Sequence, residues 1–406
     1  MDAPLRGFDP LTELESQAED ITGRRFRLLY LAALLSYGDR YLIPPLLVSM
    51  SRDLDVSLAA VTSVATVYFF LYGLTQPVHG VLSDRFGRVR VMRAAMVGMA
   101  VANVAAAAAP ALGYLVAAKA VSASFAAGIL PTSLAYVGDK VRFTLRQQVI
   151  ANVLAAGAVG TVAAIAAGGL LARFTSWRLA FAAYAVVALL LSARLHRLPE
   201  SLSGERGAGP FAQARLVLRH RWAVFLILLA VAEGAVMLAF LTFLAPALEA
   251  TGQSAAVAGV VVATYGVGVF VGLQSVKRLV SRTSMSPPRA IVGGGVLLVA
   301  AYLVAALDQG VLNILAASVL IGAAYAFLHS TLQTWATETA PEARGTAISF
   351  FVAAVYTGAA VGTAAVGGLA DAGRYRQLFL IAAGLTVPLA VVASVARARF
   401  SSANPA

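Results

Sequence analysis

Long apolar runs separated by short polar turns constrain this chain more than any other feature of its sequence. A helix needs roughly 20 apolar residues to cross the hydrocarbon core of a bilayer. About twelve runs of this length follow one another, at residues 28–50, 58–81, 91–109, 111–137, 147–171, 177–194, 222–248, 256–276, 290–307, 311–336, 345–370 and 377–396. Only helices and closed barrels satisfy their backbone polar groups in lipid. We therefore predict an all-α integral membrane protein with twelve transmembrane helices.

The composition agrees with a membrane location and argues against a nucleic-acid partner. Hydrophobic residues make up 60% of the 406 residues and charged residues only 12%, whereas a soluble domain is about half apolar and a quarter charged. The net charge is +12, but the arginines lie in short turns between apolar runs. This distribution indicates that the arginines orient the chain in the membrane and contact anionic lipid, and it argues against a nucleic-acid surface. The absence of cysteine excludes disulfides and thiolate chemistry.

The distribution of basic residues predicts the orientation of the chain. Most of the 31 Lys and Arg residues fall in the first segment, in every second turn and in the tail, so they share one side of the membrane. The positive-inside rule places that side in the cytoplasm. We expect a multi-pass protein of the cell inner (plasma) membrane with both termini cytoplasmic. Residues 1–23 are polar, and we expect no cleavable signal before the first run.

The longest polar break divides the chain into two similar halves. Residues 195–221 are rich in Gly, Pro and Arg and are predicted to be a cytoplasmic linker. The other boundaries follow: a cytoplasmic segment 1–27, an N-terminal six-helix bundle 28–194, a C-terminal six-helix bundle 222–396 and a cytoplasmic tail 397–406. Trp177-Arg178-x-x-Phe181 recurs as Tyr375-Arg376-x-x-Phe379. We interpret the halves as a pseudo-symmetric repeat.

A charged turn between the second and third runs points to a family. It reads Gly80-Val81-Leu82-Ser83-Asp84-Arg85-Phe86-Gly87-Arg88-Val89-Arg90. The turn resembles the signature Gly-x-Leu-x-Asp-Arg-x-Gly-Arg between helices 2 and 3 of the major facilitator superfamily. Ala340-Pro341-Glu342-Ala343-Arg344-Gly345 resembles that family's loop before helix 11. The resemblance implies two six-helix bundles around one central site and transport by alternating access.

The resemblance also gives the charged turn a mechanical role. Asp84 is expected near the start of helix 11, after Arg344, where a helix N-terminus favours a carboxylate. Arg85 and Arg88 would hold Asp84 from its own turn, and Gly80 and Gly87 would shape that turn. We expect this group to stabilise the state that is closed on the inside, and to make no contact with substrate.

Ionisable residues within the apolar runs are the candidate site residues, because a charge in lipid is costly and faces a partner or a cavity. Asp39 and Arg40 lie in the first run, Lys119 in the fourth, Glu233 in the seventh and His329 in the tenth. The resemblance implies that helices 1, 4, 7 and 10 line the central cavity, whereas helices 3, 6, 9 and 12 lie outside. Each predicted cavity helix therefore contains an ionisable residue.

Two carboxyl groups are candidates for proton coupling. Glu233 has no basic residue within a helical turn, so burial disfavours its charged form. Asp39 lies beside Arg40, and a partner such as Lys119 would hold it ionised. We predict that Asp39→Asn or Glu233→Gln abolishes pH-dependent transport and leaves folding intact. We assign Arg40, Lys119 and His329 to charge pairing or substrate contact.

Prolines and aromatic residues complete the predicted site. Pro44 and Pro45 remove backbone donors and are expected to bend the first helix next to Asp39 and Arg40, as a gate or binding site requires. Phe240, Phe243 and Tyr325 are expected to line the cavity, a lining that suits amphiphiles.

We therefore predict a secondary transporter, driven by the proton gradient and without a cofactor, that exports a small amphipathic or lipophilic compound such as a drug-like molecule or a lipid. Membrane lipids are the other expected partners, and we expect a monomer. Lys119 occupies the place of an arginine in drug:proton antiporters. Tyr37-Gly38-Asp39-Arg40 is similar to the first helix of organic-anion and spinster lysolipid transporters.

Several other functions stay open as alternatives. The first is transport of an anionic substrate or lysolipid anchored by Arg40 and Lys119. The second is a channel or a non-transporting membrane receptor. An enzyme is disfavoured because the sequence has no His-Glu-x-x-His motif, no cysteine and only four scattered histidines.

Overall fold

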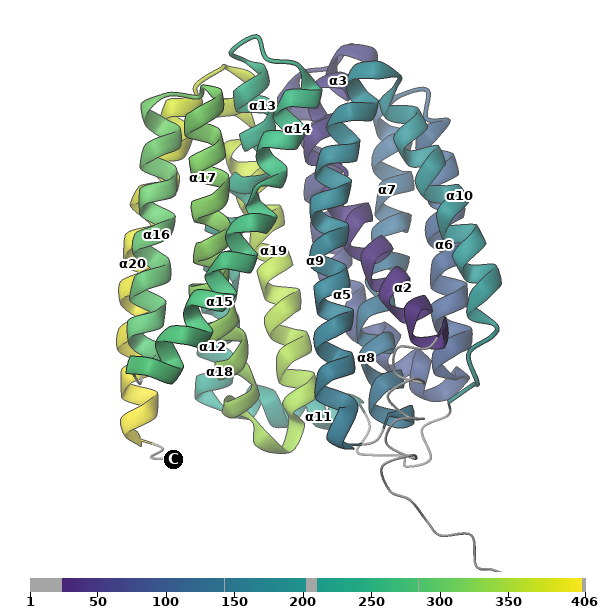
Figure 1. Cartoon of the computed structure of the whole chain (residues 1–406), viewed down its shortest axis with the longest axis vertical. Helices are drawn as coiled ribbons and strands as arrows, with labels where there is room; N and C mark the ends of the chain where they lie inside the picture. The colour runs from purple at the N-terminus through teal and green to yellow at the C-terminus, as the bar shows by residue number, and fades with distance from the viewer. Residues whose placement is uncertain (1–23, 142, 202–209, 284, 404–406) are drawn as a thin grey trace, which may run out of the picture.

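A computed structural model describes residues 24–141, 143–201, 210–283 and 285–403. Within these ranges the chain forms helices that run side by side along one axis (Figure 1). The first half contains α2 (Arg24–Tyr41), the 3₁₀ turn η1 (Pro44–Leu46), α3 (Leu47–Asp53), α4 (Leu58–Val61), α5 (Ser63–Phe86), α6 (Arg88–Ala107), α7 (Leu112–Ala126), α8 (Ile129–Lys140), α9 (Phe143–Phe174) and α10 (Trp177–Leu195).

The second half repeats this pattern after a short helix, α11 (Pro210–Arg219). It contains α12 (Arg221–Leu241), α13 (Leu244–Glu249), α14 (Ala255–Ala263), α15 (Tyr265–Thr283), α16 (Pro287–Leu307), α17 (Val311–Ala324), the π-helix η2 (Tyr325–His329), α18 (Ser330–Thr339), the 3₁₀ turn η3 (Pro341–Ala343), α19 (Arg344–Asp371) and α20 (Tyr375–Ala403).

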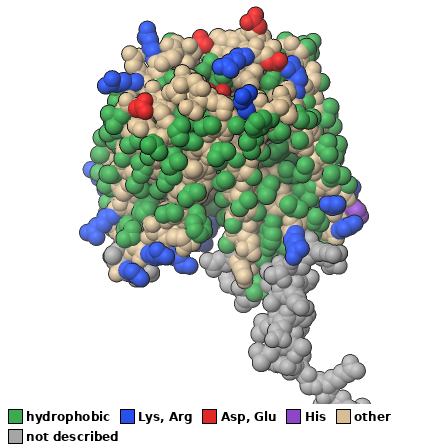
Figure 2. Space-filling model, turned by 45° about the horizontal axis from the view of Figure 1, so that its top comes forward, with side chains coloured by type: hydrophobic (Ala, Val, Ile, Leu, Met, Phe, Trp, Pro, Cys, Tyr) green, Lys and Arg blue, Asp and Glu red, His purple; other side chains and the backbone are tan. Residues whose placement is uncertain are grey.

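The predicted all-α membrane fold is confirmed. Among the described residues, 11 helical segments are long and apolar enough to cross a membrane. The first crossing is α2–η1–α3, which is interrupted at its prolines and gives the twelfth span (Figure 1). In the view of Figure 2, hydrophobic side chains cover the middle of the molecule and charged side chains gather towards its two ends. This is the surface that a multi-pass membrane protein presents to lipid.

Within the described residues, six spans are interrupted: the first, second, fourth, seventh, eighth and tenth, and the breaks of the second and eighth lie at Thr62 and Thr264. The break in the first span lies between Tyr41 and Pro44, and those in the fourth and seventh follow Ala126 and Leu241. The tenth is widened by the π-helix η2. By contrast, α20 contains Pro388 and continues without a break. All four spans in which the sequence places its candidate ionisable residues are interrupted, but so are the second and eighth spans.

The helices form a central group flanked by two outer pairs. The outer pairs are α6 with α10 and α16 with α20, which lie at opposite edges of the bundle (Figure 1). Their exposed side chains include Val101, Leu190, Val296 and Val391. In the centre, α5 of the first half packs on α19 of the second, and α9 packs on α14. The central helices therefore form the boundary between the halves.

The halves are joined most closely at the end that contains α3 and α13, the upper end of Figure 1. A Cβ atom at Gly169 would lie only 2.3 Å from the carbonyl oxygen of Ala255, so α9 and α14 are in backbone contact there. The Asp371 carboxylate, at the end of α19, accepts hydrogen bonds from the N–H groups of Leu58 (2.8 Å) and Ala59 (3.4 Å) at the start of α4. The upper end is therefore closed.

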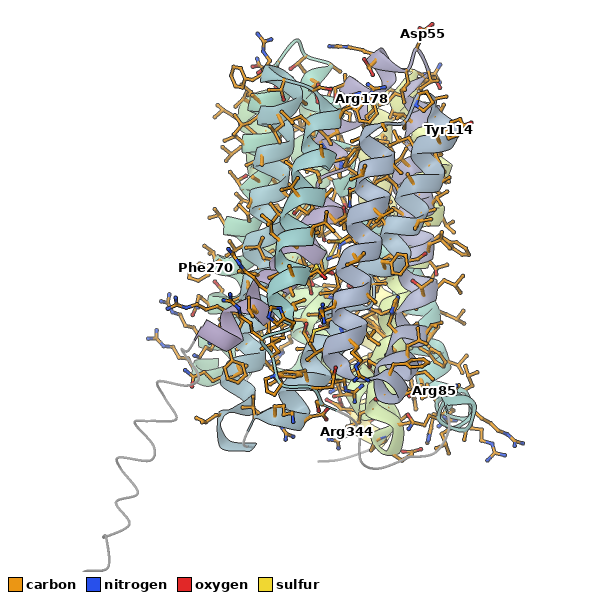
Figure 3. All side chains as sticks on the ribbon, turned by 90° about the vertical axis from the view of Figure 1, so that its right-hand side faces the viewer. Asp55, Arg85, Tyr114, Arg178, Phe270 and Arg344 are labelled. Atoms are coloured by element: carbon orange, nitrogen blue, oxygen red, sulfur yellow. The ribbon has the colours of Figure 1, made fainter. Side chains whose placement is uncertain are left out.

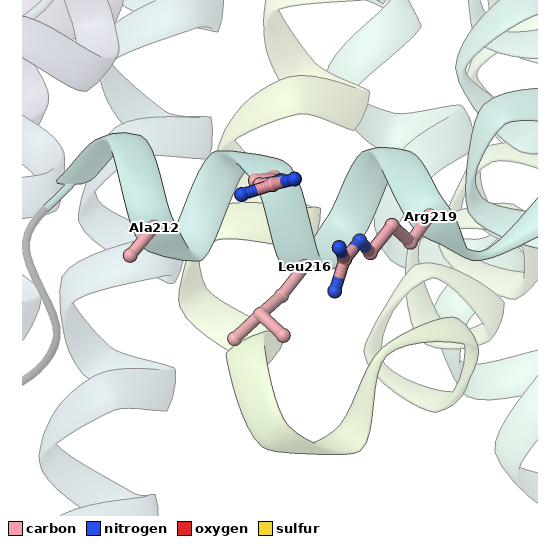
Figure 4. A pocket seen from close by; sticks show the side chains of 4 residues that line it. Ala212, Leu216 and Arg219 are labelled. Carbon is pink, nitrogen blue, oxygen red and sulfur yellow. The ribbon is translucent and has the colours of Figure 1, made fainter.

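Some segment boundaries differ from the prediction. The linker contains an unpredicted helix, α11, whose exposed groove is lined by Ala212, Arg215, Leu216 and Arg219 (Figure 4). The last helix continues to Ala403, into the predicted tail. Short helices of mixed polarity lack the 20-residue apolar signal on which the sequence analysis relied. The predicted N-terminal segment up to residue 23 and linker residues 202–209 lie outside the described residues.

Candidate functional site

Asp39 is the centre of a buried polar cluster in the first half. Its Oδ1 accepts hydrogen bonds from Lys119 Nζ (2.8 Å) and Asn103 Nδ2 (2.9 Å). Its Oδ2 accepts from Tyr68 Oη (2.8 Å) and Ser122 Oγ (2.7 Å). Asp39 and Lys119 are both 0% exposed. Every donor comes from another helix of the same half, so this cluster ties α2 to α5, α6 and α7.

Lys119 is held entirely inside the bundle. Besides Asp39, its ammonium group donates to Asn103 Oδ1 (3.2 Å) and lies 4.7 Å from the ring centroid of Phe181. Removing one partner of a buried ion pair costs about 3–5 kcal/mol, because the other charge is left without compensation. The pair is therefore a strong constraint on the packing of the first half.

Arg40 points away from Asp39 and into a cage of tyrosine rings. The guanidinium carbon lies 4.6 Å from the ring centroid of Tyr37, 4.9 Å from those of Tyr41 and Tyr72, and 4.8 Å from that of Tyr356. Tyr356 belongs to α19 of the other half, and its hydroxyl accepts a hydrogen bond from Arg40 Nη1. Arg40 therefore lies on the boundary between the halves, where it is 2% exposed.

The cage stabilises the guanidinium but supplies no negative charge. A desolvated cation–π contact contributes about 2 kcal/mol or more, and it offsets part of the several kcal/mol of hydration that a buried ion loses. Arg40 Nε is buried and has no hydrogen-bond partner. In the part of the chain that the structure describes, no carboxylate contacts this guanidinium.

Glu233 and His329 form the corresponding pair of the second half. Glu233 Oε1 lies 2.9 Å from His329 Nδ1, and Glu233 is 1% exposed. Glu233 Oε2 is buried without a hydrogen-bond partner. His329 ends the π-helix η2 and stacks on Tyr325, with ring centroids 4.4 Å apart. A single-turn π-helix is frequent at functional sites, and here it places His329 on Glu233.

The structure brings some predicted aromatic residues to the centre and not others. Tyr325 stacks on His329 and meets Tyr265 edge to face, with ring centroids 6.3 Å apart, so it lies beside the Glu233–His329 pair. Phe240 instead packs on Tyr302 of α16, inside the second half (5.8 Å between centroids). Phe243 is fully buried at the break before α13. Pro44 and Pro45 form the buried turn η1, directly after the helix that positions Arg40.

The charged turn predicted to act in gating makes its contacts within the first half. Asp84 forms an ion pair with Arg88, one helical turn away. Arg88 also donates to Asp139 Oδ2 (3.1 Å). Arg85 and Arg344 both lie at the lower end of the molecule (Figure 3). Among the described residues, no ion pair or hydrogen bond joins Asp84 to Arg344. A Cβ atom at Gly80 would meet nothing within 4 Å.

Gly87 is required by its backbone and by a neighbour. Its backbone φ angle is +99°, a value that residues other than glycine rarely adopt. A Cβ atom there would lie 2.7 Å from the carboxyl group of Glu200, which accepts hydrogen bonds from the N–H groups of Val89 (2.9 Å) and Arg90 (3.1 Å). Glu200 therefore caps the start of α6.

Several site residues were missed by sequence reasoning. Asn103, Ser122, Tyr68 and Tyr356 complete the two clusters, yet each is a neutral polar residue in an apolar run. Asn103 had a usable signal, because an amide within a membrane span needs hydrogen-bond partners. Ser and Tyr are common in membrane helices, and their roles emerge only from the packing.

The fold and the site define a class of protein: a polytopic membrane protein built from two similar halves, with a buried charged cluster in each half and Arg40 on the boundary between them. The model of the Major Facilitator Superfamily matches residues 29–310 and 239–405. The chain belongs to this superfamily.

Individual relatives are similar over part or most of the chain. A triacylglyceride transporter of Mycolicibacterium smegmatis is 29% identical over 170 residues, which cover 41% of this chain and 30% of that protein. The chloramphenicol resistance protein of Streptomyces lividans is 27% identical over 340 residues, 82% of this chain and 86% of that one. The chain therefore matches less than a third of the length of the triacylglyceride transporter.

The fold is shared with a solved transporter structure. A bacterial homologue of the human lysosomal transporter Spinster, in an inward-facing and unoccupied conformation, superposes with a TM-score of 0.77 at 18% sequence identity. The match covers 98% of this chain and 100% of that chain.

Proposed function

We propose that this chain is a secondary transporter that works by alternating access and uses the proton gradient to export a small amphipathic or lipophilic compound. It acts as a monomer in the cell inner membrane with both termini cytoplasmic, and it has no enzymatic activity. The observation that supports coupling most directly is the Glu233–His329 pair, because a buried carboxyl with one unbonded oxygen is able to gain and lose a proton. The names of the relatives above, resistance protein and triacylglyceride transporter, support an amphipathic cargo.

Of the two proposed proton-coupling carboxyls, Glu233 is better suited than Asp39. Asp39 accepts hydrogen bonds at both oxygens and faces an ammonium group. It would bind a proton only if Lys119 moved away. Within this proposal Lys119 is a positioning residue for Asp39, and His329 shares the proton with Glu233. The closed upper end is the extracellular side, and Asp84 reaches the start of α19 in the opposite state.

Transport in proteoliposomes tests this proposal. Vesicles that contain the purified chain are loaded with chloramphenicol or a fluorescent acylglycerol, and a pH gradient is imposed. We expect movement of the compound that stops when the gradient is collapsed, and loss of this gradient dependence in Glu233→Gln. Asp55→Asn is the matched control, because Asp55 is an exposed carboxyl at the upper end (Figure 3). Movement that is independent of the gradient, or a Glu233→Gln variant that behaves like the unmodified chain, would overturn the proposal.

A second candidate, transport of an anionic substrate, is favoured by one observation: the uncompensated charge of Arg40. Lys119 is not available as a second anchor in this arrangement, because Asp39 and Asn103 occupy it.

A further inference from the structure

Helix α11 is fastened to the second half at the lower end of the molecule (Figure 1). Val217 of α11 is 0% exposed and shares a buried cluster with alanine side chains of α12, η3 and α19. The hydroxyl of Thr346 in α19 donates a hydrogen bond to Gln213 Oε1 (2.7 Å). His220, which follows α11, contacts Glu342 of η3. These contacts fix which face of α11 is buried and which face is presented outwards.

The outer face of α11 carries two arginines beside a groove. The groove has a volume of about 410 Å³ and is lined by Ala212, Arg215, Leu216 and Arg219 (Figure 4). Arg215 and Arg219 are both exposed, and their four-residue spacing places them on the same face of the helix. Residues Pro210–Arg219 include no acidic side chain. Among the described residues, neither guanidinium forms an ion pair, so no carboxylate balances the charge of this groove.

Helix α11 lies where the chain enters the membrane. Only His220 separates Arg219, the last residue of α11, from Arg221, the first residue of the span α12. Trp222 follows, and the guanidinium carbon of Arg221 lies 5.9 Å from the centroid of its ring. Tryptophan is enriched at the level of the lipid headgroups. Leu218 is 56% exposed on α11, so the outer face combines apolar and basic side chains, as in a helix that lies in the membrane interface.

We propose that the groove of α11 binds the phosphate group of an anionic phospholipid. Arg215 and Arg219 present donors to the phosphate oxygens, because a planar guanidinium matches two oxygens of such a group. Leu216 packs against the glycerol and the first carbons of the acyl chains, and the small side chain of Ala212 leaves room for the headgroup. Because the lower end is cytoplasmic in the proposed orientation, the lipid belongs to the inner leaflet. This lipid site is separate from the proposed cargo site.

A bound lipid would hold α11 against the second half. Behind α11 lies a narrow pocket whose lining includes Val217, Ala336 of α18 and Phe351 of α19. The ring of Phe351 lies 5.7 Å from that of His329. Helix α11 therefore covers the packing of α18 and α19 next to the Glu233–His329 pair. A ligand that binds the folded chain and not the unfolded chain raises its stability, so we expect anionic lipid to raise the thermal unfolding midpoint.

Native mass spectrometry of the full chain tests this site, because it counts the lipids that stay bound. The probes are dioleoyl phosphatidylglycerol, dioleoyl phosphatidylcholine and glycerol phosphate, each titrated at the same pH and without a membrane gradient. The attraction of an arginine for anionic lipid corresponds to about fivefold in affinity, and that of two arginines to about 30-fold. We therefore expect phosphatidylglycerol to bind about 30-fold more tightly than phosphatidylcholine, and glycerol phosphate not to compete.

Variants at exposed positions separate the groove from the general positive charge of the chain. Arg215→Gln/Arg219→Gln should weaken phosphatidylglycerol by about 30-fold, to the level of phosphatidylcholine, and abolish its effect on unfolding. Ala212→Phe fills the groove and keeps both arginines, and it should also weaken phosphatidylglycerol. Arg282→Gln/Arg289→Gln is the matched control, because it removes the same charge from exposed arginines of α15 and α16 outside the groove. This control should bind phosphatidylglycerol as the unmodified chain does.

Contradicting outcomes are distinct for the lipid site and for the proposed function. Equal binding of the two lipids, equal binding by the Arg215→Gln/Arg219→Gln variant and its control, or unchanged binding in Ala212→Phe would overturn the lipid site. Competition by glycerol phosphate would also overturn it, because the groove would then take a soluble phosphate compound. None of these measurements uses cargo or a proton gradient. Selective binding of phosphatidylglycerol by a chain without proton-driven export would leave the lipid site standing and reject the proposed function.

Discussion

At the scale of single residues, the two carboxyl groups proposed for proton coupling have different environments. Both oxygens of Asp39 accept hydrogen bonds inside one half, whereas Glu233 contacts His329 through Oε1 and its Oε2 has no hydrogen-bond partner. The sequence predicts that a partner such as Lys119 holds Asp39 ionised, but it does not show that both oxygens of Asp39 are bonded. That difference depends on Asn103, Ser122 and Tyr68, which come from three other helices.

The Asp39–Lys119 pair gives the first prediction. Asp39→Asn removes the anion and leaves a buried ammonium group unpaired, so we now expect destabilisation of about 3–5 kcal/mol and not the intact folding anticipated from the sequence. The double variant Asp39→Asn/Lys119→Met removes both charges and should recover most of that loss. The measurement is the thermal unfolding midpoint in detergent, with Asp55→Asn as control. Unchanged unfolding of Asp39→Asn would contradict this role.

At the scale of helices, close backbone contact holds the second half together. A Cβ atom at Gly358 of α19 would lie 1.8 Å from the carbonyl oxygen of Val231 in α12. Small residues at such positions let membrane helices approach closely. Gly358, Gly362 and Gly367 recur along this span, but the sequence alone does not identify α12 as its partner.

The second prediction concerns this contact. Gly358→Ala must push α12 and α19 apart and should cost about 1–3 kcal/mol, the usual penalty of overpacking. Gly384→Ala in α20 is the matched control, because a Cβ atom there meets nothing within 4 Å and alanine favours a helix by roughly 0.5–1 kcal/mol. Thermal unfolding of the two variants should therefore move in opposite directions. Equal shifts would show that α12 and α19 are not in tight contact.

A third prediction concerns the closure of the upper end. Asp371 accepts hydrogen bonds from the start of α4, and the loss of such a cap costs about 0.5–2 kcal/mol. Asp371→Ala should therefore widen the upper end. Spin labels at Tyr114→Cys and Leu312→Cys, both exposed positions, measure the distance between the halves at the upper end. The chain lacks cysteine, so no other site takes up the label. An unchanged distance distribution would mean that Asp371 does not contribute to closure.

At the scale of the whole molecule, composition and charge predicted the architecture. Because lipid offers no hydrogen-bond partners, each span must satisfy its backbone N–H and C=O groups within a helix. The apolar runs of the sequence therefore predicted nearly every membrane helix. They did not predict α11, because a surface helix of ten residues has no such signal. The sequence points to Arg40, Lys119, Glu233 and His329 and indicates Lys119 as a partner for Asp39, but it does not pair Glu233 with His329 or place Arg40 among tyrosine rings. Pairing depends on helix rotation and on the breaks after Tyr41 and at Tyr325, which local sequence does not determine.

The central claim is that one proton on the Glu233–His329 pair shifts the chain between states closed at opposite ends. Spin-label distances in nanodiscs test it without knowledge of the substrate. One label pair is Tyr114→Cys/Leu312→Cys at the upper end, and the other is Lys140→Cys/Thr334→Cys on the helices α8 and α18 at the lower end. We predict that changing the pH lengthens one distance as it shortens the other, and that Glu233→Gln abolishes this response. Distances that do not change with pH, or a response that persists in Glu233→Gln, would contradict the claim.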